Sequence, residues 1–179
     1  MTSPAPRLLT LLKLGLAACV LLGGADAFAQ FKNHTIGFEA GYMVVGRSLG
    51  ASSGPVIGID SSLYIENGFD LFFRVAAGIH EDLLARSNSV GFFPAMGVRY
   101  LFSEEHLQPF LGANLAFMHF FGSPNLPPAL FSVSPNVGLS YYFTEDFSVG
   151  LQAEYHLILS LNQTPAHAFA PIARVAWGF

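Results

Sequence analysis

The sequence predicts an all-β protein: an eight-stranded antiparallel up-and-down transmembrane β-barrel, preceded by a signal peptide. Three observations indicate this fold class. Of the 179 residues, 52% are hydrophobic and only 11% are charged, whereas about 25% charged residues are usual in soluble domains. Long segments alternate apolar residues with small or polar ones, with the period of two that is typical of strands. The connections between these segments are alternately long and short, as in a meander with two different ends.

Composition also excludes several classes of protein. The formal net charge of −4 argues against a basic surface for nucleic acid, and the mean hydropathy of +0.47 argues against disorder. The single cysteine, Cys19, allows neither a disulfide framework nor a cysteine-bearing zinc site. The six histidines are scattered without metal-ligand spacing. We therefore expect no metal and no cofactor.

The N-terminal stretch 1–29 is predicted to be a cleaved signal peptide. Two basic residues precede an uncharged apolar region at 14–24, and the small-x-small cleavage pattern follows at Ala27 and Ala29, directly before Gln30. This stretch is the only one that comes near the length of a membrane-spanning helix, which needs about 20 apolar residues. The excess of hydrophobic residues in the rest of the chain therefore needs another explanation.

Cys19 leaves a second interpretation open. Residues 16–19 also read as a lipobox, in which Cys19 would become a lipidated N-terminus rather than leave with the signal. The apolar core of the signal would then be short, so we favour cleavage before Gln30 and a mature barrel of residues 30–179. Because the signal removes two basic residues and one acidic residue, the mature chain keeps six basic and eleven acidic residues. Charge therefore stays scarce after cleavage.

Eight segments show the strand alternation. It is clearest in 147–160, where Phe147, Val149 and Leu151 share one face and small or polar residues occupy the other. It is least certain in 109–121, because both faces there are mostly apolar. The predicted strands span about 34–45, 55–65, 69–80, 90–102, 109–121, 131–143, 147–160 and 168–179. These are longer than the usual strand of about five or six residues.

The connections indicate an up-and-down order. Those after the second, fourth and sixth strands, at 66–68, 103–108 and 144–146, are short and charged, and Asn67-Gly68 is a strong hairpin signal. The other four, at 46–54, 81–89, 122–129 and 161–167, are longer and rich in Gly, Ser, Pro and Asn. Long and short connections therefore fall at opposite ends of the predicted barrel.

The positions of the charges indicate which face of the sheet meets lipid. Ten of the seventeen charged residues beyond the signal lie in the N-terminal approach or in connections, and the other seven share the non-apolar face of their strands: Glu39, Asp60, Asp70, Arg74, Arg99, Glu154 and Arg174. That face is otherwise small and polar, which suits a tightly filled interior better than a solvated exterior. The apolar face should then meet lipid, with a girdle of aromatic residues at the short-turn end formed by Phe69, Phe102, Phe143, Phe147, Trp177 and Phe179.

The chain ends with Val175, Trp177 and Phe179 at alternate positions, and 108–113 has the sequence Gln-Pro-Phe-Leu-Gly-Ala. In these features and in its architecture the sequence resembles the small eight-stranded outer-membrane β-barrels of Gram-negative bacteria, similar to the transmembrane domain of OmpA-like proteins. The resemblance implies export through the periplasm to the outer membrane. It implies contact with outer-membrane lipid and lipopolysaccharide, and a C-terminal signal at Val175, Trp177 and Phe179 that the barrel-assembly machinery reads. Any envelope protein partner is unknown, and no nucleic acid is expected.

The seven strand charges are interpreted as a polar network that plugs the interior. By strand neighbourhood, Arg174 is expected to face Glu39 and Glu154, Arg74 to face Asp60, and Arg99 to face Asp70. This predicts a structural or accessory component of the envelope. A small-solute channel is the alternative, and eight strands leave little room for one.

A lipid-A-modifying enzyme is the less favoured alternative. His156 and Ser160 share a face with Glu154, but that face points inward, away from acyl chains. We therefore expect no catalytic residues.

Overall fold

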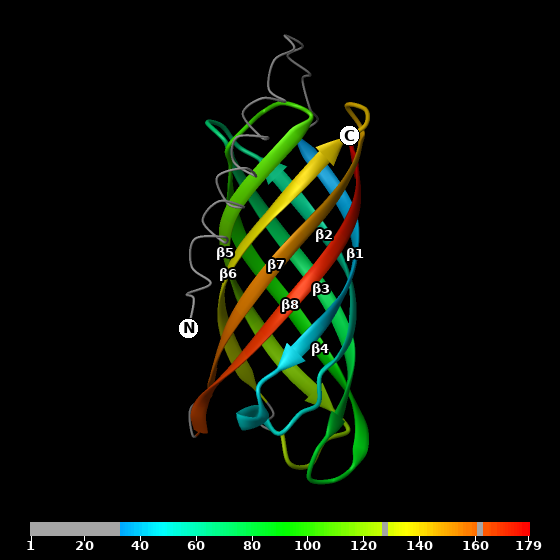
Figure 1. The fold of residues 1–179 in the computed structure, drawn as a ribbon, viewed down its shortest axis with the longest axis vertical. Coiled ribbons are helices and arrows are strands. Elements are labelled where there is room, and N and C mark those ends of the chain that lie inside the picture. Colours follow the sequence, from blue (N-terminus) through cyan, green and yellow to red (C-terminus); the bar gives the residue numbers. More distant parts are fainter. Residues whose placement is uncertain (1–32, 127–128, 161–162) are drawn as a thin grey trace, which may run out of the picture.

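The computed structural model describes residues 33–126, 129–160 and 163–179, which form a closed barrel of eight strands in sequence order (Figure 1). The strands are β1 (His34–Val45), β2 (Gly54–Tyr64), β3 (Phe69–Asp82), β4 (Ser87–Leu101), β5 (Leu107–Phe121), β6 (Leu130–Tyr142), β7 (Phe147–Ser160) and β8 (Gln163–Gly178), with a short 3-10 helix, η1 (Arg47–Leu49), after β1. Every pair is antiparallel, and β8 closes the barrel on β1. The predicted fold class is confirmed. The predicted signal, with Cys19, Ala27, Ala29 and Gln30, lies outside the described residues.

The turns between β2 and β3, β4 and β5, and β6 and β7 lie at one end of the barrel, here called the turn end, together with the C-terminus (Figure 1). Asn67 and Gly68 have positive φ angles of 55° and 83°, as a type I′ hairpin turn requires. The opposite end, here called the loop end, carries η1 and the connection between β5 and β6.

In two of the four connections predicted to be long, part of the stretch is strand instead. β3 and β4 continue pairing to Asp82 and Ser87, which leaves only 83–86 as a turn. β8 begins at Gln163, five residues before the predicted start, and pairs there with β7. The polar residues in these stretches led to the prediction of loops from the sequence. They are compatible with strands because both stretches lie at the ends of their strands, away from the middle of the barrel wall.

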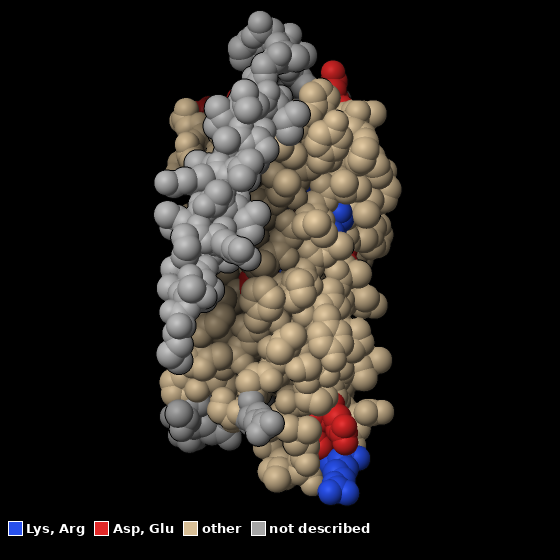
Figure 2. Space-filling view, viewed as in Figure 1, with Lys and Arg blue, Asp and Glu red and all other residues tan. Residues whose placement is uncertain are grey.

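The outer face of the barrel is apolar. Large hydrophobic side chains on alternate positions are exposed along the strands, such as Ile57 at 67%, Met96 at 64% and Leu151 at 69%. Figure 2 shows this face as almost uniformly uncharged, with the charged residues concentrated near the two ends. At the turn end, predicted girdle residues pack against one another: Phe147 contacts both Phe143 and Trp177. Phe69 packs edge to face on Tyr100, which was not among the predicted girdle residues. In the described part of the chain no helix has the length and apolarity to cross a membrane.

The barrel interior changes character along its axis. Towards the loop end it is filled by an apolar cluster of side chains from all eight strands and the loops: Met43, Leu49, Ala51, Val56, Ala76, Phe93, Met118, Phe120, Leu126, Leu130, Ile158, Ala166 and Ala168. The middle holds buried charged and amide side chains, and the turn end holds a cavity. The candidate site is therefore the interior itself.

Candidate functional site in the barrel interior

An aromatic cluster, here called the plug, lies in the interior towards the loop end. The rings of His80, Phe93 and Phe120 contact one another edge to face, with centroids 5.6–5.7 Å apart. Met118 and Leu130 lie in the same cluster and are almost completely buried. Because these side chains come from β3, β4, β5 and β6, they fill the lumen from several walls at once.

A carboxylate clasp holds the loops over this plug. Asp82 accepts hydrogen bonds from the backbone N–H groups of Leu84 and Ala85, at 2.9 and 3.0 Å, and from the Ser123 hydroxyl and the Asn125 amide of the next loop. These bonds, that from Ser123 above all, lower the pKa of Asp82 to about 2. The charged form of Asp82 therefore ties the β3–β4 turn to the β5–β6 loop.

The deepest ion pair in the middle of the barrel joins Arg74 and Glu154. Two guanidinium nitrogens of Arg74 donate to the two oxygens of Glu154, both at 2.8 Å, in the bidentate geometry that gives the strongest pairs. Glu39 lies 3.6 Å from the same guanidinium. Glu154 also accepts from the amides of Asn114 and Gln152, each at 3.2 Å. A fully buried carboxylate is thus neutralised and hydrogen-bonded from several strands.

A second group of ion pairs lies towards the turn end. Arg174 binds Asp60 through Nε at 2.8 Å and through Nη2 at 2.6 Å, and also donates to the Thr35 hydroxyl. Gly37 lies directly beside this pair, and a Cβ at that position would collide with both partners. The glycine therefore makes room for the ion pair.

Arg99 completes the second group. Its Nε lies 3.1 Å from Asp70, its Nη2 lies 3.8 Å from Asp60, and its guanidinium lies 4.3 Å from the centre of the Phe72 ring. This position combines an ion pair with a cation–π contact. Arg99 and Arg174 thus share Asp60 as a partner.

All seven strand charges singled out in the sequence lie inside the barrel, and each is less than 9% exposed. Their pairing differs from the expected one except between Arg99 and Asp70. Arg74 is the backbone partner of Asp60, and Arg174 that of Glu39, yet their strongest ion pairs are with Glu154 and Asp60, respectively. The reason is geometric. From β3, Arg74 reaches across the narrow lumen to β7, whereas Arg174 on β8 passes beside Gly37 of β1 to reach β2.

One cluster was missed from the sequence. The ring of His156 on β7 lies 2.6 Å through Nδ1 from the Ser134 hydroxyl on β6, and 3.3 Å through Nε2 from Glu154. Counting residues outward from the 144–146 turn would have placed Ser134 opposite His156, because the neighbouring pairs Val133–Leu157 and Asn136–Glu154 are in register. Ser160, which shares a face with His156 in the sequence, is not among the described side chains. All three members of the cluster are buried, with Ser134 and Glu154 at 0% exposure.

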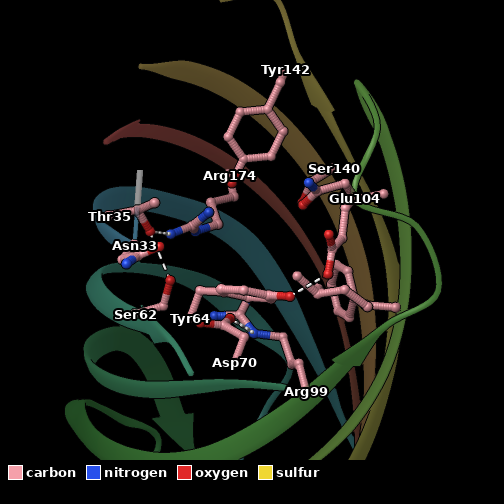
Figure 3. A pocket seen from close by; sticks show the side chains of 13 residues that line it. Asn33, Thr35, Ser62, Tyr64, Asp70, Arg99, Glu104, Ser140, Tyr142 and Arg174 are labelled. Carbon is pink, nitrogen blue, oxygen red and sulfur yellow. Dashed lines mark hydrogen bonds and ion pairs between the residues drawn. The ribbon is translucent and has the colours of Figure 1, made fainter. Parts of the chain in front are cut away.

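A cavity of about 270 Å³ opens into the interior at the turn end (Figure 3). It is lined from seven of the eight strands and their ends by Asn33, Thr35, Ser62, Tyr64, Asp70, Arg99, Leu101, Glu104, Gln108, Phe110, Ser140, Tyr142 and Arg174. Figure 3 shows Arg174 and the Arg99–Asp70 pair among the side chains around it, and a hydrogen bond from the Tyr64 hydroxyl to Glu104. The adjoining space in the middle of the barrel, beside Arg74 and Glu154, measures only about 20 Å³, room for about one water molecule.

No metal centre is formed by the described side chains: nowhere in 33–126, 129–160 or 163–179 do three or more His, Asp or Glu side chains meet in a group that could hold an ion. The chemistry of the interior is that of ion pairs, hydroxyls and amides.

No protein-family model matches the sequence, and no curated protein matches it significantly. Solved structures do match. Neisserial surface protein A is 19% identical over 82% of this chain and 97% of its own, with a TM-score of 0.66. The outer membrane protein OprG of Pseudomonas aeruginosa is 11% identical over 86% and 99%, and the outer membrane enzyme PagL 15% over 77% and 97%, both with a TM-score of 0.54. At such identities the likeness concerns the fold, and it agrees with the apolar outer face: this chain has the fold of the small eight-stranded outer-membrane β-barrels.

Proposed function

We propose that this protein is a structural or accessory outer-membrane barrel whose interior does not conduct solutes from one side to the other. The observation that carries the proposal is the difference in open volume along the barrel axis. A cavity of about 270 Å³ at the turn end adjoins a space of about 20 Å³ beside the Arg74–Glu154 pair, and the aromatic plug lies between that space and the loops. Eight strands give an interior that side chains can fill completely.

The outer face and the chain end suggest the partners. Outer-membrane lipid, including lipopolysaccharide, would cover the exposed apolar side chains. The barrel-assembly machinery would read Val175, Trp177 and Phe179 during insertion, of which Trp177 and Phe179 are exposed on the outer face at the turn end.

Planar-bilayer recordings test the proposal. Purified protein should give at most small and rare conductances, because no water-filled path runs through the plug. A double variant that shortens the plug, Phe93→Ala with Phe120→Ala, serves as a positive control and should conduct more often. Large, stable channels from the unmodified protein would contradict the proposal and favour the solute-channel alternative.

An enzymatic role is the weaker alternative, and the cluster of Ser134, His156 and Glu154 is the one observation that favours it, since serine hydrolases use such a set. Burial argues against it: Ser134 has no exposed surface and does not border the turn-end cavity. Glu154 is also engaged by Arg74 rather than left to orient the histidine alone. Incubation with lipid A should release no fatty acid, and release that disappears in Ser134→Ala would establish the enzyme.

A further inference from the structure

The turn-end cavity is a blind pocket. Its inner boundary is formed by ion-paired Arg99 and Arg174, beyond which the lumen narrows to about 20 Å³. At about 270 Å³ its volume lies close to the lower end of the about 300–1,000 Å³ that is usual for small-molecule sites. The cavity therefore has the size to retain a small molecule rather than to pass one through.

The charges of this pocket are compensated. Arg174 is paired with Asp60, and Arg99 with Asp70. A charged ligand would have to give up its hydration in exchange for groups that already have a buried partner, which is unfavourable. The remaining charge, Glu104, is exposed at the rim and accepts a hydrogen bond from Tyr64. The pocket therefore favours a ligand without net charge.

Neutral hydrogen-bonding groups dominate the rest of the wall. Gln108 on β5 and Ser140 on β6 are backbone partners, so their side chains lie next to each other on the inner face. Both border the pocket, with exposures of 4% and 8%, and neither has a side-chain hydrogen bond to another described residue. An amide and a hydroxyl each supply a donor and an acceptor. Beside them the Phe110 ring offers an apolar surface.

We propose that this pocket binds a small neutral polyhydroxylated molecule, a sugar of mono- to disaccharide size, either free or at the end of a glycan strand. Sugar hydroxyls both donate and accept, which matches the paired amide and hydroxyl of Gln108 and Ser140, while the C–H face of a sugar ring can pack on Phe110. Short turns of outer-membrane barrels face the periplasm, so the ligand would enter from that side.

Titration calorimetry on the mature chain in lipid nanodiscs tests the proposal, because detergents with sugar headgroups would compete. Maltose and N-acetylglucosamine are the neutral probes, and acetate and inorganic phosphate are the charged ones. We expect saturable binding of a neutral sugar only. Gln108→Leu should weaken sugar binding about five- to tenfold, because one hydrogen bond is lost and a sugar hydroxyl is left buried without a partner. Ser140→Trp should abolish it by filling the pocket, and Leu139→Trp, the outward-facing neighbour of Ser140, should leave it unchanged.

Co-sedimentation with insoluble cell-wall glycan distinguishes the two sources of sugar. Pull-down that maltose competes away would identify a glycan end, and binding of the soluble sugars alone would identify a free solute. Heat-modifiable migration on a gel verifies that each variant is folded. The proposal is overturned if folded wild-type protein binds neither sugar, if phosphate or acetate binds instead, or if Gln108→Leu and Ser140→Trp both bind as the wild type does.

Discussion

The two ends of the barrel are built from similar strands but differ in the side chains that fill the interior. At the loop end the inward positions carry large apolar side chains, such as Phe93, Met118 and Phe120, which are buried against one another. At the turn end the inward positions carry hydroxyls, amides and ion pairs around open space. The outer face, by contrast, is apolar at both ends. The difference therefore lies only in the residues that point inward.

The ion pairs of Arg74 with Glu154 and of Arg174 with Asp60 separate these regions. A charge buried without a partner is very costly, so these pairs hold the walls together only as complete sets. The loop end is thus stabilised by packing and the middle by mutual neutralisation of charges, whereas the turn end tolerates open space.

The largest effect is expected from the middle of the barrel. Glu154→Ala leaves Arg74 with only Glu39, at 3.6 Å, and removes the acceptor of two buried amides. We expect the free energy of unfolding, measured by urea titration in lipid vesicles, to fall by about 3–5 kcal/mol. Glu104→Ala at the exposed rim is the matched control and should cost less than about 1 kcal/mol. Equal losses in the two variants would show that the buried network does not stabilise the barrel.

The plug and the cavity wall can be compared directly through two phenylalanines, each 3% exposed. Phe93→Ala empties a packed site between His80 and Phe120, and we expect a loss of about 3–5 kcal/mol in the free energy of unfolding. Phe110→Ala enlarges a cavity that already exists, so water can enter and the loss should be about half as large. A larger loss at Phe110 would contradict the assignment of the turn end as the open end.

Much of this architecture follows from the sequence, because a period of two assigns each strand residue to one face once a single frame is fixed. Glu39 and Arg174 were placed inward by that argument alone, and β7 has the predicted bounds. The start of β8 was predicted too late, since the polar residues around Gln163 do not distinguish a loop from a strand end. Alternation says which residues enter the lumen, but not which of them meet.

The side-chain partners of Arg74 and Arg174 illustrate the limit. Both arginines have a carboxylate as backbone partner on a neighbouring strand, which is the pairing that sequence reasoning selects. The closed barrel brings β3 and β7 to face each other across the lumen, so Arg74 reaches Glu154 instead. The cavity itself was not predictable either, because open space depends on how side chains of seven strand regions converge, and no local pattern encodes it.

Thiol labelling should distinguish the turn end from the middle of the barrel by reaction rate. Residues 30–179 contain no cysteine, so single cysteines report one site each. Ser140→Cys in the cavity wall should react with a small water-soluble maleimide, whereas Ser134→Cys in the middle, at 0% exposure, should react about a hundredfold more slowly. The ratio of the two rates is measured on folded protein in vesicles by mass spectrometry. Similar rates would mean that water reaches Ser134 as freely as it reaches the cavity.

The smallest effect concerns the clasp over the plug. Asp82 lies next to the outward-facing, exposed Glu81 at the tip of the β3–β4 hairpin, outside the apolar band. Because its pKa is lowered from an ordinary value near 4 to about 2, its contribution to stability is fully present above pH 4 and is lost as the pH falls through 2. Hydrogen exchange at the Leu84 and Ala85 amides should therefore become severalfold less protected between pH 4 and pH 2, relative to the intrinsic rate at each pH. Asp82→Asn keeps one acceptor oxygen but cannot titrate, so its protection at these amides should be weaker and should not change over that range. If protection of the wild type were also independent of pH between 4 and 2, the charge of Asp82 would not hold the loops. The apolar contacts of Leu49 and Leu126 alone would then close this end.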